Sequence, residues 1–382
     1  MNLDLTEDQI QIRAAVRDLC RSEFAAQAAQ WDRDDAIPPA AIQKLAEMGL
    51  LGMNIPEEHG GLGYDARTVV TVIEEIARVS AALAIMVAVH NSVGAYPIYR
   101  YGNDEQRKKY LPKLTSSHVG AFSLSEPGCG SDAAALTTTA RRDGDRYVLN
   151  GEKNWVTNGR HTWTFLVLAR TGEPGPKGIS AFIIENDQPG LTIGKSEDKM
   201  GLRGSDTVTL AFDNARVPVA QRLGADGEGF KIALSMLDSG RIGVAAQALG
   251  VMTAAFHEAT RYAQQRQAFG GPIAKIQAVQ FKLAEMERRI QASRLLIRKA
   301  AWLKDSGQDF IRAASMAKLY TTEAATWVTH QAIQVHGGYG YVKDYVVERY
   351  YRDVRVMEIY EGTSEIQRLV IARSMLKDGV KA

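Results

Sequence analysis

The chain has 382 residues, 45% of them hydrophobic and 24% charged, so it is long enough for two or three domains with sizeable cores. Its 46 basic and 44 acidic residues are interspersed and leave a net charge of +2, which argues against nucleic acid and against an anionic membrane as partners. Its 2 cysteines, Cys20 and Cys129, form neither a disulfide framework nor a CxxC motif, as is typical of a reducing compartment.

The N-terminus carries no targeting signature. The opening residues, MNLDLTEDQIQIRAAV, are acidic and amphipathic, with no basic region, no apolar h-region and no Arg-rich transit peptide. The most apolar window, residues 81–89, is about half as long as a membrane span requires, which favours a buried helix. We therefore expect a soluble, cytoplasmic protein; a matrix protein that has lost its transit peptide would also fit.

Residues 1–118 are expected to form an N-terminal helical domain. Thr6 can cap a first amphipathic helix. Pro38 and Pro39 open another helix, because proline is favoured in the first turn. A glycine-rich loop then precedes a long helix over residues 66–79.

Residues 119–225 change period and are expected to form a β-domain. Short apolar runs, YVLN, TFLVLAR, ISAFIIE and VTLAF, are separated by Gly, Pro, Asn and Asp. Asn150 and Gly151 stand between two apolar runs, and Asn-Gly is a strong signal for a tight hairpin. The sequence therefore predicts a turn at these two residues.

Residues 226–382 return to helical periodicity in four long segments, 230–266, 276–304, 310–336 and 364–376. Short connections between long helices favour an antiparallel bundle. The sequence thus predicts an α+β multidomain protein, with an N-terminal helical domain, a middle β-domain of barrel or sandwich type, and a C-terminal antiparallel four-helix bundle.

This order of regions carries six motifs that together resemble the acyl-CoA dehydrogenase family. They are AFSLSEPGCGSD (121–132), EKNWVTNG (152–159), LDSGRIGVAAQALG (237–250), RQAFG (266–270), QVHGGYG (334–340) and EIYEGTSEIQR (358–368). The third and sixth are most similar to the short-chain (butyryl-CoA) subfamily. The resemblance implies a homotetrameric FAD enzyme of fatty acid β-oxidation that converts a short-chain acyl-CoA to the trans-2-enoyl-CoA and passes electrons to electron transfer flavoprotein.

Glu361 is the candidate base. Oxidation at Cα–Cβ requires removal of a weakly acidic α-proton, and a carboxylate can do this if burial raises its pKa toward neutrality. The alternative is that Glu361 caps the helix that begins near Ser364. The family places its base at this position, and Gly240, where some members carry the base instead, has no side chain. The resemblance also implies that the backbone N–H of Glu361 and a flavin hydroxyl bind the thioester oxygen.

The resemblance assigns the flavin ring to the second quarter of the chain. An indole can cover an aromatic face, and a hydroxyl can donate to the atom that receives the hydride. Taken singly, Trp155 could be a core aromatic, and Ser125 and Thr157 could serve ordinary turn and strand roles. The implied contacts are Phe122, Leu124, Ser125, Gly130, Ser131, Trp155, Val156 and Thr157.

The resemblance assigns the rest of FAD to the C-terminal region. Arg266 can neutralise a pyrophosphate, and adjacent glycines permit close backbone approach. The glycines of HGGYG could equally be a helix C-cap. Several of these positions hold the adenosine half of FAD across a subunit interface in the family, which implies a tetramer built of dimers. The implied contacts are Arg266, Phe269, Gln277, Gln334, Gly337, Gly338, Thr363 and Glu365.

Asp238 and Arg241 are assigned to the CoA end of the substrate, together with Ser131. Asp238 precedes a clear helical run, so Arg241 is expected in the first turn, where a cation opposes the helix dipole and indicates a polar or anionic partner. The alternative is an Asp–Arg surface pair. Tyr360 and Gly362 are expected to border the acyl group.

Other functions remain open from the sequence. A 2-methyl branched short acyl-CoA is an alternative substrate, because one methylene changes binding by only about 1–3 kcal/mol. A flavin oxidase and a non-catalytic, nucleic-acid-binding relative of the fold are alternatives from other classes. We find no metal-ligand constellation, since no histidine pair forms HxxxH or HExxH.

Overall fold

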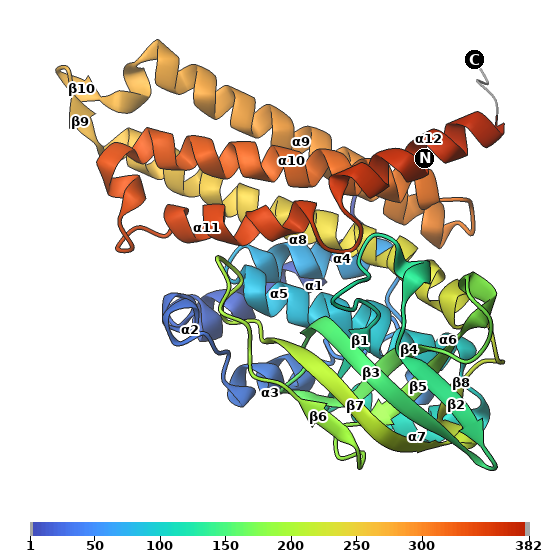
Figure 1. The fold of residues 1–382 in the computed structure, drawn as a ribbon. Coiled ribbons are helices and arrows are strands. Elements are labelled where there is room, and N and C mark those ends of the chain that lie inside the picture. The colour runs from blue at the N-terminus through green and yellow to red at the C-terminus, as the bar shows by residue number, and fades with distance from the viewer. Residues whose placement is uncertain (1–2, 379–382) are drawn as a thin grey trace.

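The computed structural model describes residues 3–378 and has three regions (Figure 1). Long C-terminal helices form a bundle along one side, N-terminal helices pack beneath it, and a β-domain lies below these. The fold class expected from the sequence is therefore confirmed. The N-terminal helices are α1 (Glu7–Leu19), α2 (Ala28–Asp34), α3 (Pro39–Glu47), α4 (Ala66–Ala77), α5 (Ala81–Val89), α6 (Tyr96–Tyr101) and α7 (Asp104–Leu114), with π-helical turns at Cys20–Phe24 and His90–Gly94.

Eight strands of the described chain form one mixed sheet in the order β6-β7-β3-β2-β4-β5-β8, and β1 pairs in parallel with β4. Their inward side chains, such as Phe165, Phe182 and Leu210, are fully buried and form a core of their own. The strands are β1 (Val119–Ser123), β2 (Thr139–Asp143), β3 (Arg146–Thr157), β4 (Thr162–Arg170), β5 (Ile179–Glu185), β6 (Leu191–Ile193), β7 (Thr207–Pro218) and β8 (Arg222–Leu223).

The hairpin predicted at Asn150 and Gly151 is wrong, because β3 runs straight through both residues. The chain turns earlier, at Gly144, where β2 ends and Asp143 pairs with Arg146. Gly151 instead marks a register shift against β7, with φ at 142°. A Cβ there would lie 2.7 Å from the Cα of Thr138, so the glycine serves a bulge rather than a turn.

The four long C-terminal helices predicted from periodicity are present, and every end lies within two residues of its predicted position. Helices α8, α9 and α10 pack against one another, and α12 packs on α10. A short helix that was not predicted, α11, also packs on α10 and α8. The elements are α8 (Gly229–Gln265), the small hairpin β9 (Gln267–Ala268) and β10 (Gly271–Pro272), α9 (Gln277–Asp305), α10 (Ile311–His336), α11 (Val347–Val354) and α12 (Ser364–Asp378).

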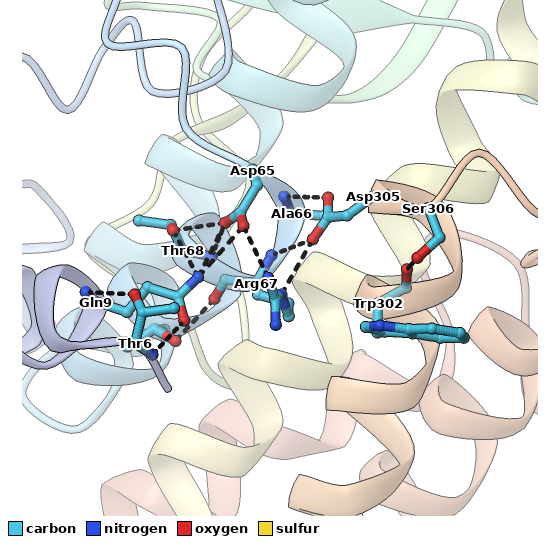
Figure 2. A network of polar contacts seen from close by, with 10 residues as sticks. Thr6, Gln9, Asp65, Ala66, Arg67, Thr68, Trp302, Asp305 and Ser306 are labelled. Atoms are coloured by element: carbon cyan, nitrogen blue, oxygen red, sulfur yellow. Dashed lines mark hydrogen bonds and ion pairs between the residues drawn. The ribbon is translucent and has the colours of Figure 1, made fainter. Parts of the chain in front are cut away.

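Polar contacts at helix ends join the N-terminal helices to the bundle (Figure 2). Thr6 caps α1 as predicted, and Gln9 donates from its side chain to Asp65, which caps α4. The carboxylate of Asp305, at the end of α9, accepts hydrogen bonds from the backbone N–H groups of Ala66 (2.7 Å) and Arg67 (3.2 Å) at the start of α4. Helices α1, α4 and α9 are thus fixed to one another at one end.

Helix α5 runs through the centre of the molecule, and all of its side chains are buried, as predicted for residues 81–89. The longer helical run Ala81–Tyr101 has the length and apolar composition of a membrane span, but 89% of its most apolar window is buried inside the fold. Below α5, the ring of His90 accepts from Gly120 N–H at 2.9 Å and donates to the carbonyl of Leu51 at 2.7 Å. Burial lowers the pKa of His90 to about 4, so this link between β1 and the N-terminal helices is neutral.

Candidate active site

Glu361 lies in a sharp turn between the 3-10 helix Arg355–Glu358 and α12. Both Glu361 (φ 55°) and Gly362 (φ 88°) have left-handed backbone conformations. Such a conformation is uncommon for a residue other than glycine and persists only where the surroundings determine it. The local sequence explains half of the turn, since Gly362 adopts this conformation at little cost.

Two buried side chains from different helices hold this turn. The ammonium of Lys318, on α10, donates to the carbonyl of Gly362 at 2.7 Å. The side-chain amide of Gln367, on α12, donates to the carbonyls of Glu361 (3.2 Å) and Gly362 (2.9 Å). Both donors are fully buried. Sequence reasoning missed Lys318, which lies outside every quoted motif, and Gln367, which lies within the motif at residues 358–368, because the role of both depends on long-range packing.

The carboxylate of Glu361 points to Gly240 on α8. Its Oε2 atom is buried and has no hydrogen-bond partner within residues 3–378, and a Cβ placed on Gly240 would lie 2.6 Å from it. Burial raises the pKa of Glu361 to about 7, although the cations of Arg241 and Lys318 act to lower it. The alternative role as a helix cap is wrong, because the hydroxyl of Thr363 accepts from Ile366 N–H at the start of α12.

Arg241 and Asp238 form a close pair, with Arg241 Nη1 2.6 Å from Asp238 Oδ1. Two expectations about this pair are wrong. Arg241 does not lie in a first turn, because α8 begins at Gly229 and continues through Asp238 without a break. The pair is also not a surface pair, since Arg241 is only 5% exposed. Arg241 therefore acts as a buried cation close to Glu361.

A third residue that the sequence did not single out, Gln247, borders the same region. Its fully buried side chain accepts from the hydroxyl of Tyr360 at 2.5 Å and donates to the carbonyl of Ala81 at 2.8 Å. Gly240 and Gly243 precede Gln247 by seven and four residues, so all three lie along one face of α8. This face carries no side chain at the two glycines and ends at the Gln247–Tyr360 bridge.

The loop after β1 is anchored by a buried ion pair. Lys153 Nζ lies 2.8 Å from Glu126 Oε1 and also donates to the carbonyl of Leu124 at 3.1 Å. Glu126 further accepts from the backbone N–H groups of Thr137 and Thr138. Lys153 lowers the pKa of Glu126 to about 2, against the opposing effect of burial. The loop holds the predicted residues Leu124 (buried), Ser125 (half-buried), Gly130 and Ser131 (both exposed), and the half-buried Phe122 lies near the end of β1.

Trp155 lies next to this loop at a register shift in β3. Its backbone is left-handed (φ 61°) and its side chain is 63% exposed, so the alternative of a core aromatic is wrong. The backbone N–H of the preceding Asn154 donates to the carbonyl of Ser125 and fixes the strand to the loop. Val156 is fully buried, and Thr157 is half-buried.

Most of the remaining predicted cofactor residues lie at another place, the end of the bundle that carries β9 and β10. Figure 1 shows this end pointing away from the sheet. A pocket of about 830 Å³ there is lined by Arg266, Gln334, Gly337 and Gly338, among others. A side chain at either glycine would meet open space, and Gly337 also ends α10 as its C-cap, so both expected roles of these glycines are compatible with the structure.

Phe269 and Gln277 flank this pocket region. Phe269 is 97% exposed and has a left-handed backbone (φ 52°), and Gln277 is an exposed residue at the start of α9. Thr363 and Glu365 are not part of this group, because they lie beside Glu361 at the start of α12. Within one chain the predicted cofactor residues therefore lie in separate groups, around the loop after β1, at the bundle end and beside Glu361.

Comparison with known proteins identifies the chain. Residues 6–118, 121–215 and 227–376 match the models of the N-terminal, middle and C-terminal domains of acyl-CoA dehydrogenase. The chain belongs to the acyl-CoA dehydrogenase family. It is therefore an oxidoreductase, and because members of this family are flavoproteins, FAD is its expected cofactor.

Three similar proteins cover nearly the whole chain. The mitochondrial short-chain specific acyl-CoA dehydrogenase of Bos taurus is 48% identical over 98% of this chain and 92% of its own length. The structure of butyryl-CoA dehydrogenase from Megasphaera elsdenii has a TM-score of 0.96 and 40% identity, covering 98% of this chain and 100% of that one. A chain from a structure of the electron transferring flavoprotein of Acidaminococcus fermentans has a TM-score of 0.97 and 43% identity, covering 99% and 100%.

The residues present fit a flavin nucleotide. Trp155 and Phe269 expose aromatic faces that the fold does not cover, and an exposed aromatic face can stack on a ring system. The loop glycines Gly128 and Gly130 leave open space beside the loop, as Gly337 and Gly338 do at the bundle end. Arg266 lies over the ring of Tyr339 at 5.5 Å and presents its cation to the adjoining pocket.

We predict that the Lys153–Glu126 pair is required for stability of the loop after β1. Lys153→Met leaves a buried carboxylate without its cation and should destabilise the protein by roughly 3–5 kcal/mol. Thermal unfolding of the FAD-saturated protein measures this loss. The double variant Lys153→Met/Glu126→Gln should regain most of it, and an equal loss in the double variant would contradict the role of the pair. Because the pKa of Glu126 is about 2 in the folded protein, the contribution of the pair should be present above about pH 4.5 and disappear as pH falls toward 2.

Proposed function

We propose that this protein is an FAD-dependent acyl-CoA dehydrogenase that oxidises a short straight-chain acyl-CoA to the trans-2-enoyl-CoA, with Glu361 as the base. The observation that carries the proposal is the carboxylate of Glu361, which has a buried oxygen without a partner and a pKa raised to about 7. A base with a pKa near the working pH combines the deprotonated form with a useful affinity for a proton.

The chain's own part in the reaction is the transfer of one proton. FAD, when bound, supplies the acceptor for the hydride that leaves Cβ. Oε2 of Glu361 takes the proton from Cα, and the C–H electron pair forms the new double bond as the hydride departs. Gly240 has no side chain, so the space beside Oε2 is left for the substrate. The dry surroundings that raise the pKa also keep water from competing for the carboxylate.

The backbone N–H of Glu361 is proposed to bind the thioester oxygen as it gains negative charge. No hydrogen bond within residues 3–378 uses this N–H group, although both carbonyls of the turn are occupied. A donor that is already fixed in direction needs no reorganisation when charge develops, and one such donor is worth about 3–4 kcal/mol in related reactions. Lys318 and Gln367 are therefore proposed as positioning residues for both the base and this donor.

Substrate and cofactor contacts follow the resemblance and stay proposals. Asp238, Arg241 and Ser131 are proposed near CoA, and Tyr360 and Gly362 beside the acyl group. The loop after β1 and Trp155 to Thr157 are proposed at the flavin ring, with Thr363 and Glu365. The cluster at the bundle end lies apart from these residues (Figure 1), which supports the proposal that it holds the adenosine half of FAD from another protomer of a homotetramer. Electron transfer flavoprotein is the proposed electron acceptor.

A short acyl chain is supported by the bridge between Gln247 and Tyr360. The stripe Gly240, Gly243 and Gln247 advances about 10 Å along α8, from the carboxylate of Glu361 to the bridge. A fully buried amide with both of its polar atoms in use is an expensive group to displace. The bridge is therefore proposed to close the acyl pocket a short distance beyond the base.

The test of the function is anaerobic reduction of the FAD-loaded protein by butyryl-CoA. Wild type should lose its flavin absorbance, and Glu361→Gln should keep its FAD but react at least about 1,000-fold more slowly. Glu358→Gln is the matched control, because Glu358 is three residues away and its carboxylate is already bound by Thr326. Bleaching by 2-methylbutyryl-CoA but not by butyryl-CoA would move the substrate to the branched alternative. Failure of the wild-type protein to retain FAD would refute the enzyme proposal.

The pH dependence of the same reaction tests the electrostatics of the base. The carboxylate is the active form, so the rate should rise with pH through about 7 and then level off. Lys318→Met removes a cation that favours the carboxylate, and should shift the rise upward by roughly one pH unit or more. Burial lowers the pKa of Lys318 itself to about 8, so it is charged at neutral pH. Lys304→Met, which removes a half-buried lysine at the C-terminal end of α9 whose charge does not act on Glu361, should leave the profile unchanged. Equal shifts in both variants would contradict the assignment.

Substitution of Gln247 tests the closed end of the acyl pocket. Gln247→Ala removes the bridge and should raise the ratio of kcat/KM for octanoyl-CoA to that for butyryl-CoA by about 10-fold or more, because each accommodated methylene is worth about 1–3 kcal/mol. Thr253→Ala is the control, since Thr253 is another buried polar residue of α8 but bonds only within the helix. An unchanged ratio in Gln247→Ala would place the end of the pocket elsewhere.

A further inference from the structure

A pocket rich in arginine lies between α1, α4, α8 and α9. It has a volume of about 230 Å³, and Leu249 lines it from α8, roughly 200° around that helix from Gln247. It is therefore on another side of α8 from the acyl pocket. Five guanidinium groups line it, those of Arg13, Arg17, Arg78, Arg294 and Arg298. Only two carboxylates, those of Glu74 and Glu75, line it with them.

The two carboxylates are already paired. Glu75 accepts two hydrogen bonds from Arg17, at 2.7 and 3.0 Å, and lies 3.5 Å from Arg78. Glu74 accepts from Arg294 at 2.9 Å. Neither carboxylate therefore forms a hydrogen bond or an ion pair with the remaining two arginines of the pocket.

Arg13 and Arg298 form no ion pair with an acidic residue within residues 3–378. Arg13 makes no hydrogen bond or ion pair there, and Arg298 donates only to the carbonyl of Leu3, at 3.2 Å. Burial lowers the pKa of Arg298, and the guanidinium groups of Arg294 and Arg13 lower it further. Glu74 and Asp4 act in the opposite direction, but together they do not restore the ordinary pKa. The pocket thus gathers more positive charge than its own acids balance.

The walls of the pocket are held in place before any ligand arrives. Figure 2 shows the network at one end of the helices, where Gln9 of α1 binds Asp65 and Thr68 of α4, and Asp305 of α9 binds the start of α4. Three of the four helices that line the pocket are joined there. A ligand would therefore meet guanidinium groups that are already assembled, and preorganisation lowers the cost of binding.

We propose that this pocket is a binding site for a small phosphate-bearing anion, held chiefly by Arg13 and Arg298. Guanidinium groups present planar pairs of N–H donors that match the oxygens of phosphate. The volume of about 230 Å³ is below the range of about 300–1,000 Å³ usual for drug-sized ligands, so inorganic phosphate or a small phosphate ester fits better than a nucleotide. The site is separate from Glu361 and does not depend on the proposed reaction.

Isothermal titration of the protein with inorganic phosphate tests the site, with FAD and CoA saturating so that their own phosphate sites are filled. A titration with sodium chloride at matched ionic strength is the reference. Wild type should bind one phosphate per chain. Arg13→Gln/Arg298→Gln should bind at least 10-fold more weakly, and Arg288→Gln, which removes an exposed arginine of α9 paired with Glu285, should bind like wild type. A parallel titration with glycerol phosphate distinguishes the free ion from an ester as the preferred ligand.

Thermal unfolding separates an anion site from a merely structural cluster. Without phosphate, Arg298→Gln should unfold at the same temperature as wild type or higher, because a repelling charge is gone. With saturating phosphate, wild type should become the more stable of the two. No saturable phosphate binding by wild type, equal binding by the double variant, or a loss of stability in Arg298→Gln that phosphate does not change would each overturn the proposal.

Discussion

The site depends on one constraint, the left-handed turn at Glu361 and Gly362. A glutamate in this conformation costs on the order of 1–3 kcal/mol, so the fold must supply a compensating interaction. Lys318 and Gln367 supply it by binding both carbonyls of the turn. The position of the carboxylate is therefore set by how α10 and α12 pack, and only indirectly by the residues beside Glu361.

Strained backbone and exposed aromatic surface coincide elsewhere in the same way. Trp155 and Phe269 both have left-handed backbones and both expose most of their side chains. A folded chain gains nothing from either feature by itself, because strain and exposed apolar surface both oppose folding. Trp155 lies beside the loop after β1, and Phe269 lies at the bundle end. This coincidence supports the proposal that these two groups of residues bind one cofactor, each group contributed by a different chain.

Long-period features were predictable from the sequence, and features decided by distant contacts were not. Periodicity over twenty or more residues located α8, α9 and α10, and the capping residue Thr6 located α1. Asn150 and Gly151 misled, because a hairpin signal cannot reveal that β3 continues to pair with β7 across them. The Asp238 pair was assigned to a helix start, although α8 begins earlier. At the site, the sequence pointed to Glu361 only through the family motif. Gln247 and Gln367 lie within two of the quoted motifs, but nothing local shows what they bind, and Lys318 lies outside all six.

The cations around Glu361 lower its pKa, whereas its burial raises it. Burial alone favours the protonated acid, which cannot accept the α-proton, whereas full compensation by cations would return an ordinary carboxylate of low basicity. Arg241 and Lys318 lie close enough to lower the pKa, but neither forms an ion pair with the carboxylate: Arg241 is bound to Asp238, and Lys318 is bound to the carbonyl of Gly362. Each cation is thus held back by a partner of its own. This arrangement leaves the pKa near 7 and the reactive oxygen free.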